Sequence, residues 1–264
     1  MTWQLINEES TDVYQNLALD EAVARITSEQ SDKSNTLRFW RSERAVVIGR
    51  FQCVHKEVNL SFCEEKKIAI ARRFTGGGAV YHDSGNLNLS ICARRSDEYI
   101  PKTLKEIYKL FIGNVSSALN SLDVPTRYDP KGSCIRIDGL KITGTAGWLK
   151  RGVVFLHGTL LINADLPMLK KSLSAPEGQP VFLRDRTRVR CMDSKRDNVT
   201  NITDQVKDCP SDDEIKAAIV QSIKEISGEN VLKGELSKEV RDTAQALYQS
   251  RYSQSEWNLG TPTQ

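Results

Sequence analysis

The stretch RRFTGGGAVYHDSGNLN, residues 72–88, constrains this chain more than any other. Gly76, Gly77 and Gly78 remove every side chain from a short piece of backbone, so another group can approach its N–H groups closely and positive φ angles are accessible. Backbone amides that line a concavity suit an anion such as a phosphate or a carboxylate, especially beside arginines. The alternative is a plain glycine turn, but the polar residues that follow it favour a binding site.

Composition and charge narrow the class of protein. The chain has 264 residues, 39% of them hydrophobic, and a formal net charge of +3. This apolar fraction is large enough to form a hydrophobic core, and the nearly balanced charge gives no reason to expect nucleic-acid binding. The first ten residues do not resemble a secretory signal, and no apolar run approaches the roughly 18 residues of a membrane span. We therefore expect a soluble, cytoplasmic protein with neither nucleic acid nor membrane as a partner.

The cysteines are scattered along the chain without a CxxC pair or a nearby pair of histidines. This pattern predicts neither a zinc site nor a disulfide framework, and it favours free thiols in a reducing compartment. The six positions are Cys53, Cys63, Cys92, Cys134, Cys191 and Cys209.

Hydrophobic spacing predicts one α/β domain that covers residues 1–264, without internal repeats or a clear linker. The glycine turn falls between two strands, not between a strand and a helix. Helices are expected over 13–28, 57–67, 101–122, 165–173, 211–227 and 235–249, and strands over 36–40, 45–48, 68–73, 79–81, 87–92, 133–137 and 153–162.

Two local signals sharpen this outline. Asp138-Gly139 is typical of a tight hairpin turn, and Ser211 with Glu214 forms a capping box that begins a helix. Between these elements, residues 174–198 combine prolines and a glycine with six basic residues. Such a long segment is typical of a functional loop, although a solvated charged surface is the alternative.

Common nucleotide-binding and hydrolase motifs are absent. The sequence contains no GxxxxGK[ST], GxGxxG, HExxH or GxSxG. What remains is an anion-binding turn and a lysine, Lys141, in the segment DGLKITG. A lysine that alternates with apolar residues usually lies on the solvent-facing side of a strand. Gly144 and Gly147 nearby, however, suggest that backbone or a ligand approaches closely here.

Several of these segments together resemble the lipoate–protein ligase family. ARRFTGGGAVYHDSGNLN is similar to its signature RRxxGGGxVxHDxGNxN, DGLKITGTA to its lysine segment, and LHGTLLINADL to its histidine strand. NLALDEA, VVIGRFQ, RDNVTNITD and SEWNLG also fit, so the resemblance runs from about residue 5 to 260. The wider superfamily includes biotin ligases and octanoyltransferases. The fold implied is α/β (α+β): mixed, largely antiparallel sheets flanked by helices.

The resemblance implies a ligase that works in two steps. Lipoate and ATP, with Mg²⁺, give lipoyl-AMP and pyrophosphate, and the lipoyl group then passes to a lysine of an acceptor. Expected acceptors are lipoyl-domain proteins, namely E2 subunits of 2-oxoacid dehydrogenases, and the glycine-cleavage H protein. Lys141 would be the catalytic residue, and residues 174–198 would be the adenylate-binding loop. The implied nucleotide and lipoyl-AMP ligands are Arg72, Arg73, Gly76, Gly77, Gly78, Ala79, Val80, Tyr81, His82, Asn86, Asp129, Lys141 and His157, with no protein ligand to a metal.

Two departures from the family keep other functions open. Many members carry a C-terminal accessory domain that this sequence lacks, so the chain is expected either to act alone or to need a separate accessory subunit. Octanoyltransferases use a cysteine thioester and no ATP, and Cys134 lies seven residues before Lys141. A nucleophilic cysteine needs exposure and a lowered pKa, whereas Cys134 alternates with apolar residues and reads as a strand residue.

Overall fold

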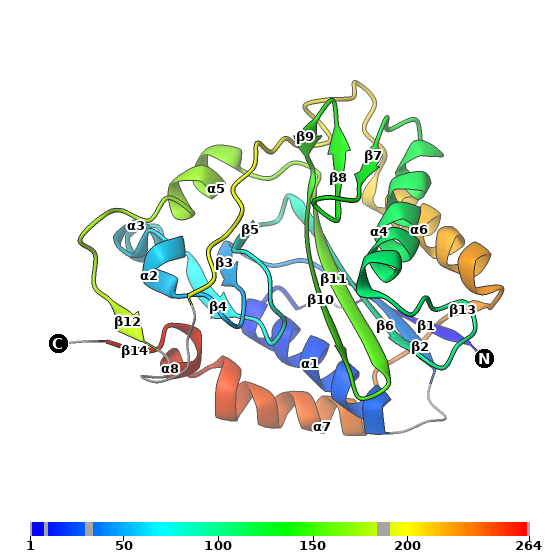
Figure 1. Cartoon of the computed structure of the whole chain (residues 1–264), viewed down its shortest axis with the longest axis horizontal. Coiled ribbons are helices and arrows are strands. Elements are labelled where there is room, and N and C mark those ends of the chain that lie inside the picture. The colour runs from blue at the N-terminus through cyan, green and yellow to red at the C-terminus, as the bar shows by residue number, and fades with distance from the viewer. Residues whose placement is uncertain (1, 8–9, 30–33, 184–190, 263–264) are drawn as a thin grey trace.

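A computed structural model describes residues 2–7, 10–29, 34–183 and 191–262. Its centre is a mixed sheet in the order β10-β11-β6-β2-β1-β13 (Figure 1). Strand β1 is parallel to both β2 and β13, whereas β2, β6, β11 and β10 pair antiparallel. The six strands are β1 (Trp3–Asn7), β2 (Asn35–Trp40), β6 (Asn86–Arg94), β10 (Thr143–Lys150), β11 (Val153–Leu161) and β13 (Val231–Lys233).

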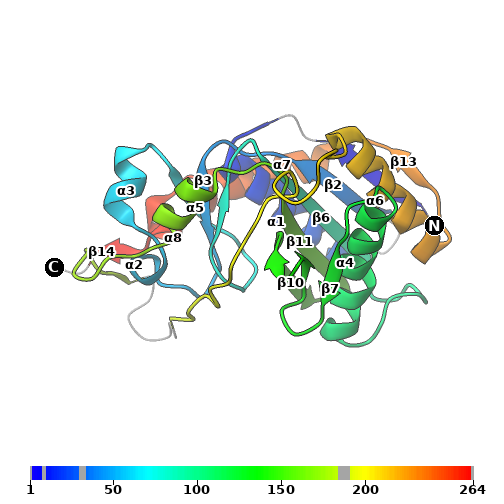
Figure 2. The same ribbon diagram turned by 90° about the horizontal axis from the view of Figure 1, so that it is seen from above.

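Helices cover both faces of this sheet (Figures 1 and 2). On one face lie α4 (Leu104–Asn120) and α6 (Asp212–Ser227), which pack against Leu89 and Ile91 of β6 in the largest core cluster. On the other lie α1 (Val13–Glu29) and α7 (Lys238–Leu247). Because side chains alternate along a strand, the same strand that gives Leu89 and Ile91 to one face turns polar residues toward α1.

A smaller sheet, in the order β4-β3-β5, stands beside the large one. Strand β3 (Ala45–Ile48) runs parallel to β4 (Ala69–Arg72) and antiparallel to β5 (Val80–His82). Its outer side packs in a third cluster against short helices. These helices are α2 (Val54–Glu57), α3 (Leu60–Glu65) and α5 (Leu166–Ser172).

The remaining elements are short. A three-stranded sheet contains β7 (Arg127–Asp129), β8 (Cys134–Ile137) and β9 (Leu140–Lys141), and β12 (Phe182–Leu183) pairs with β14 (Thr261–Pro262). A π-helical turn (Tyr248–Tyr252) and α8 (Ser255–Asn258) follow α7. No helix in the described ranges is long and apolar enough to cross a membrane.

Local sequence signals account for several boundaries. Ser211 and Glu214 form the expected capping box at the start of α6. Asp138 and Gly139 have φ angles of +46° and +80°, which suit the tight turn between β8 and β9. Thr103 caps α4, whose first residue is Leu104 instead of Pro101 as expected, because the Thr103 hydroxyl accepts from the N–H of Glu106.

Other expectations need correction. The helix expected over 57–67 is two short helices, α2 and α3, separated by Val58 and Asn59. Strand β1 and the edge strand β13 were not expected, and neither was the full length of β10. The sequence did not predict β10 as a strand because Gly144 and Gly147 lie within it, and glycine has a low strand propensity. Both are needed for packing: a Cβ on Gly144 would lie 2.6 Å from Val80 Cγ1.

The expectation of six free thiols is also wrong. Cys53 and Cys191 form a disulfide, with their Cα atoms 5.1 Å apart. They are 138 residues apart in the sequence, and nothing in their spacing indicates a pair. The fold brings them together because the chain from Cys191 onward lies against the segment that follows β3. Among the described residues, Cys63, Cys92, Cys134 and Cys209 are free.

Candidate active site

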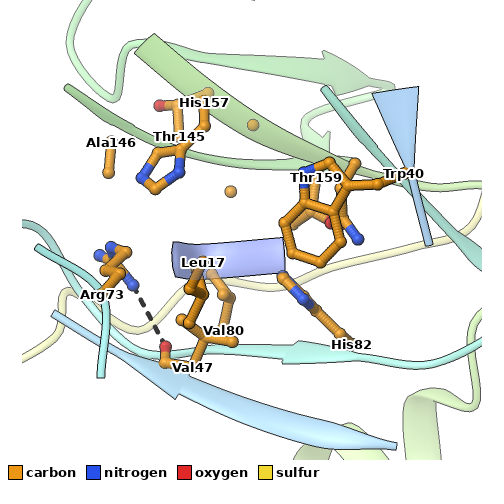
Figure 3. A pocket seen from close by; sticks show the side chains of 13 residues that line it. Leu17, Trp40, Val47, Arg73, Val80, His82, Thr145, Ala146, His157 and Thr159 are labelled. Carbon is orange, nitrogen blue, oxygen red and sulfur yellow. Dashed lines mark hydrogen bonds between the residues drawn. The ribbon is translucent and has the colours of Figure 1, made fainter. Parts of the chain in front are cut away.

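A pocket lies between the two sheets, beside α1 (Figure 3). Its floor consists of two rows of side chains that run across the large sheet. One row contains Ala146 and His157, and the other contains Gly144, Thr159, Asn88 and Trp40, as the strand pairing requires. The complete lining is Leu17, Trp40, Val47, Arg73, Val80, His82, Asn88, Gly144, Thr145, Ala146, His157, Gly158 and Thr159.

The glycine turn joins β4 to β5 and forms the pocket's rim next to Arg73. Gly77 has a φ angle of +86°, a conformation that favours glycine. The turn also lies tightly on the loop after β3, since a Cβ on Gly49 would clash with the carbonyl oxygen of Gly77. Gly77 is thus required by its φ angle, and Gly78 by Ser194, whose hydroxyl oxygen would lie 2.9 Å from a Cβ at that position, whereas a Cβ on Gly76 would make only ordinary contacts.

Arg73 places a buried positive charge inside this turn. Its guanidinium donates to the carbonyl oxygens of Val47, Gly76 and Gly78 at 3.1, 2.6 and 2.8 Å. Burial lowers the pKa of Arg73 to about 10, so the group still carries its charge at neutral pH. No carboxylate in the described ranges forms an ion pair with it. A buried cation without a counter-ion favours the arrival of an anionic ligand.

The neighbouring Arg72 points the other way, away from the pocket. Its guanidinium donates to the carbonyl oxygens of Gly49, Gln52 and Trp257 at 3.0, 2.6 and 2.9 Å. The side chain is fully buried and is not part of the pocket lining. Arg72 therefore ties the loop after β3 to the C-terminal segment, so its role in this structure is to support the site.

A chain of buried polar groups crosses the floor of the pocket. The Thr75 hydroxyl lies 2.7 Å from His157 Nε2, and His157 Nδ1 lies 3.3 Å from an oxygen of Asp20. Asp20 also accepts from Arg38 and from the Ser90 hydroxyl, at 2.6 and 2.7 Å. Burial lowers the pKa of His157, so its imidazole is neutral at pH 7.

Sequence reasoning missed three members of this chain, Thr75, Asp20 and Arg38. A signal for Asp20 was present, because an acidic residue inside the apolar helix segment NLALDEA needs a buried partner.

The end of the pocket away from Arg73 is closed by Trp40 and His82, whose rings meet edge to face at 5.5 Å (Figure 3). Burial is the main reason that the pKa of His82 falls to about 3, and the nearby charge of Arg73 acts in the same direction. Both histidines of the pocket are therefore neutral under ordinary conditions, and the positive charge is concentrated at the Arg73 end.

Lys141 lies on β9, three residues before Gly144. Its backbone is fixed on both sides, because its N–H donates to Asn198 O at 2.9 Å and its carbonyl accepts from Thr200 N at 3.1 Å. The side chain is half-buried, and no carboxylate of the described residues forms an ion pair with it. Its charge helps to lower the pKa of Asp197, after the larger effect of Arg136. Lys141 is thus a second cation without a carboxylate partner among the described residues; it lies outside the pocket lining, three residues before Gly144, which is part of that lining.

The other predicted site residues lie in different surroundings. Asp129 pairs with Arg136 at 2.9 Å and lines a separate groove beside β7. Asn86 holds the turn before β6, accepting from the N–H of Asp83 and donating to the Thr159 hydroxyl. Tyr81 is buried in the third core cluster, whereas Val80 and His82 on the same strand line the pocket. The structure therefore groups Arg73, Val80, His82 and His157 in one lining. The other predicted site residues lie outside that lining: Arg72, Gly76, Gly77, Gly78, Ala79, Tyr81, Asn86, Asp129 and Lys141.

The C-terminal part of the predicted adenylate-binding loop crosses the glycine turn; residues 184–190 of that loop lie outside the described ranges. We name residues 191–198 the strap. The Ser194 hydroxyl accepts from Ala79 N and from Gln52 Nε2, at 2.8 and 2.9 Å. Arg196 pairs with Glu57 at 2.8 Å, and Cys191 is bonded to Cys53. The strap is therefore attached by side chains to the segment that follows β3, at Gln52, Cys53 and Glu57, and it meets the end of the glycine turn through the Ala79 N–H.

No group of three or more His, Cys, Asp or Glu side chains in the described part of the chain is placed to hold a metal ion. A divalent cation at this pocket would therefore take its ligands mainly from a bound phosphate and from water, as Mg²⁺ commonly does with nucleotides.

Comparison with known proteins identifies the class to which this fold and pocket belong. A family model described as the lipoyl protein ligase A/B catalytic domain matches residues 12–224. Lipoate-protein ligase A subunit 1 of Thermoplasma acidophilum is 32% identical over 253 residues, which are 93% of this chain and 91% of that protein. Lipoate-protein ligase LplJ of Bacillus subtilis is 28% identical over 256 residues, 96% of this chain and 72% of that protein.

Solved structures agree with this assignment. A Thermoplasma acidophilum protein assigned to the lipoate protein ligases, with bound lipoic acid, superposes with a TM-score of 0.83 at 30% identity, over 98% of this chain and all of that one. A lipoate-protein ligase A bound with ATP gives 0.82 at 31% identity, over 98% and 99% of the two chains. A bipartite lipoate protein ligase from Thermoplasma acidophilum, solved in a study of that ligase and its E2 lipoyl domain, gives 0.83 at 31% identity, over 100% and 98%.

The chain belongs to the lipoyl protein ligase A/B catalytic domain family. The family and the mixed α/β fold expected from the sequence are both confirmed.

Proposed function

We propose that this chain is an ATP-dependent lipoate–protein ligase that first forms lipoyl-AMP and then transfers the lipoyl group to a lysine of an acceptor protein. One observation carries the proposal: the apolar pocket ends at a buried arginine without a counter-ion, beside a glycine turn and near a second unpaired cation, Lys141. Related structures contain lipoic acid and ATP. An acyl tail with a carboxylate at one end matches the largely apolar lining of this pocket and the positive charge at its Arg73 end.

In the first step, a carboxylate oxygen of lipoate attacks the α-phosphorus of ATP and pyrophosphate leaves. This reaction brings two anions together, so it needs positive charge more than it needs a nucleophile or a base of the protein. Arg73 and Lys141 supply that charge, and the backbone N–H groups of the glycine turn are available for phosphate oxygens. Mg²⁺ bound with ATP would neutralise further phosphate charge. Lys141 is the residue to which we assign the principal catalytic role.

In the second step, the ε-amino group of the acceptor lysine attacks the carbonyl carbon of the mixed anhydride, and AMP leaves with the bonding electrons. Water is the competing nucleophile, so the intermediate must be covered. The strap lies directly over Ala79 at the glycine turn, where it limits access of solvent. We infer that the strap keeps lipoyl-AMP on the enzyme until the acceptor arrives.

We propose lipoyl-domain proteins as the acceptors, which include E2 subunits and the glycine-cleavage H protein. The Thermoplasma relative is named as subunit 1 of its ligase, and one solved structure comes from a study of a bipartite ligase and its E2 lipoyl domain. We accordingly propose that a separate accessory subunit assists this chain.

The acyltransferase alternative depends on Cys134 and finds less support. Cys134 is fully buried, and burial raises the pKa of its thiol. A nucleophilic cysteine requires the opposite, an exposed group with a lowered pKa. Lipoyl transfer from a carrier through Cys134 is therefore not the function that we propose.

The proposal is tested by lipoylation of an isolated lipoyl domain, followed by the mass of that domain. With lipoate, ATP and Mg²⁺, and with an accessory subunit where one is needed, the mass should increase by one lipoyl group only when ATP is present. The Cys134→Ser variant should perform equally well. ATP-independent transfer from an octanoylated carrier, lost in Cys134→Ser, would instead favour the acyltransferase.

A further inference from the structure

The far end of the pocket, opposite Arg73, combines apolar walls with polar residues. Figure 3 places Trp40 and His82 at this end and Arg73 at the other, with Leu17 and Val80 between them. Strand pairing sets Asn88 directly beside Trp40 on β2 and beside Thr159 on β11. Asn88 therefore lies in the floor of the far end, in the same row as Trp40.

Three polar atoms here have no hydrogen-bond partner within the described ranges: Nδ2 and Oδ1 of Asn88, and Nδ1 of His82. Asn88 is 2% and His82 5% exposed. Buried polar atoms are nearly always paired, because an unpaired one loses its hydration without replacement. Their presence in an apolar pocket does not help the fold, so they point to a bound group that uses them.

The location of Asn88 and His82 in the pocket indicates which part of a bound acid would contact these unpaired polar atoms. With the carboxylate near Arg73 and Lys141, the tail of the acid extends between Leu17 and Val80 toward Asn88. A plain hydrocarbon tail would leave all three polar atoms unpaired. A sulfur atom at the end of the tail offers lone pairs to the amide and imidazole N–H groups, and a thiol also offers a weak S–H donor to Asn88 Oδ1.

We propose that Asn88, with His82 beside it, is the residue that makes this pocket prefer a sulfur-containing acyl tail to a saturated tail of the same length. The proposal rests on the ligase function above and adds the determinant of tail chemistry. Asn88 acts by binding the tail, not by taking part in the reaction at the carboxylate.

The test is calorimetric binding of lipoate and octanoate to the wild-type chain and to Asn88→Leu. The wild type should bind lipoate about tenfold more tightly than octanoate, the size expected for one satisfied polar group. Asn88→Leu should bring the two dissociation constants within about threefold, because octanoate no longer leaves the amide unpaired. Val80→Ala is the matched control: it enlarges the apolar wall and should weaken both acids by similar factors.

Thermal unfolding without ligand provides a second readout. Removal of two unpaired buried atoms should raise the midpoint of Asn88→Leu by about 2–4 °C. A purely structural asparagine would produce a fall. Asn88→Ser, which keeps a small polar group, should retain part of the preference and serves if the leucine variant fails to fold.

An unchanged ratio of the two dissociation constants in both variants would overturn the proposal while leaving the ligase function intact. Absence of binding of either acid to the folded wild type, with ATP present, would instead contradict the ligase function itself.

Discussion

Adjacent arginines have opposite roles in this site. Arg73 faces the pocket without a counter-ion among the described residues, while Arg72 donates to the backbone carbonyls of Gly49, Gln52 and Trp257 behind it. The motif indicates that two arginines matter, and a residue-level rule could have separated them, since neighbours in a strand point to opposite faces. Which of the two faces lines the pocket depends on where the large sheet packs, and the residues next to the arginines in the sequence do not reveal this.

At the residue scale, Lys141→Ala should abolish adenylate formation while leaving the fold intact. The charge that brings carboxylate and α-phosphate together is lost, so lipoate-dependent pyrophosphate release should fall by at least about 100-fold. The thermal midpoint should stay near that of the wild type, because Lys141 is anchored through its backbone. Lys150→Ala, which removes an exposed lysine at the end of β10, the next strand along the chain, should change neither quantity. Normal pyrophosphate release by folded Lys141→Ala would refute the assignment.

His82 predicts a pH dependence of stability. Its pKa is about 3 in the folded chain and about 6.5 in the unfolded chain. Below the unfolded value only the unfolded state takes up the proton, so stability is lost as pH falls from about 6.5. The free energy of unfolding, from urea titrations at pH 7 and pH 5, should drop less in His82→Phe, by up to about 1.4 kcal/mol per pH unit. Equal drops in the two proteins would show that His82 does not contribute.

Among the elements, the strap is the clearest case of structure that the sequence did not reveal. A basic loop was expected over 174–198, but not its fixed end, where Ser194, Cys191 and Arg196 contact the chain after β3, at Gln52, Cys53 and Glu57 in that order. These contacts join residues about 140 positions apart, and such partners depend on the completed fold. By contrast, the hairpin at Asp138-Gly139 and the capping box at Ser211 depend on neighbours in sequence and were predicted.

The disulfide allows the contribution of the strap's attachment to the stability of the protein to be measured. Cys53→Ser should lower the free energy of unfolding by about 2–4 kcal/mol, because the bridge closes a long loop in the unfolded chain. A reducing agent should destabilise the wild type by a similar amount and leave Cys53→Ser unchanged. Cys209→Ser, which alters a free cysteine, should retain the response to reductant. Insensitivity of the wild type to reductant would show that the bridge is not formed in solution.

For the whole molecule, the site depends on how two sheets are set beside one another. The large sheet supplies His157, Asn88 and Trp40, and the small sheet supplies Arg73, Val80 and His82. The sequence allowed most helices and inner strands to be predicted because their apolar spacing is regular. It could not predict the chain Thr75–His157–Asp20, because these residues meet only when α1 packs on the large sheet.

Activation of lipoate by ATP in this pocket releases pyrophosphate. The decisive experiment therefore measures pyrophosphate release from the purified chain with ATP and Mg²⁺, with and without lipoate, and repeats it with a candidate accessory subunit added. We expect release that requires lipoate in at least one of these conditions and that is lost in Lys141→Ala. Release that is absent in every condition, from a folded chain that binds both ATP and lipoate, would show that this pocket does not form lipoyl-AMP.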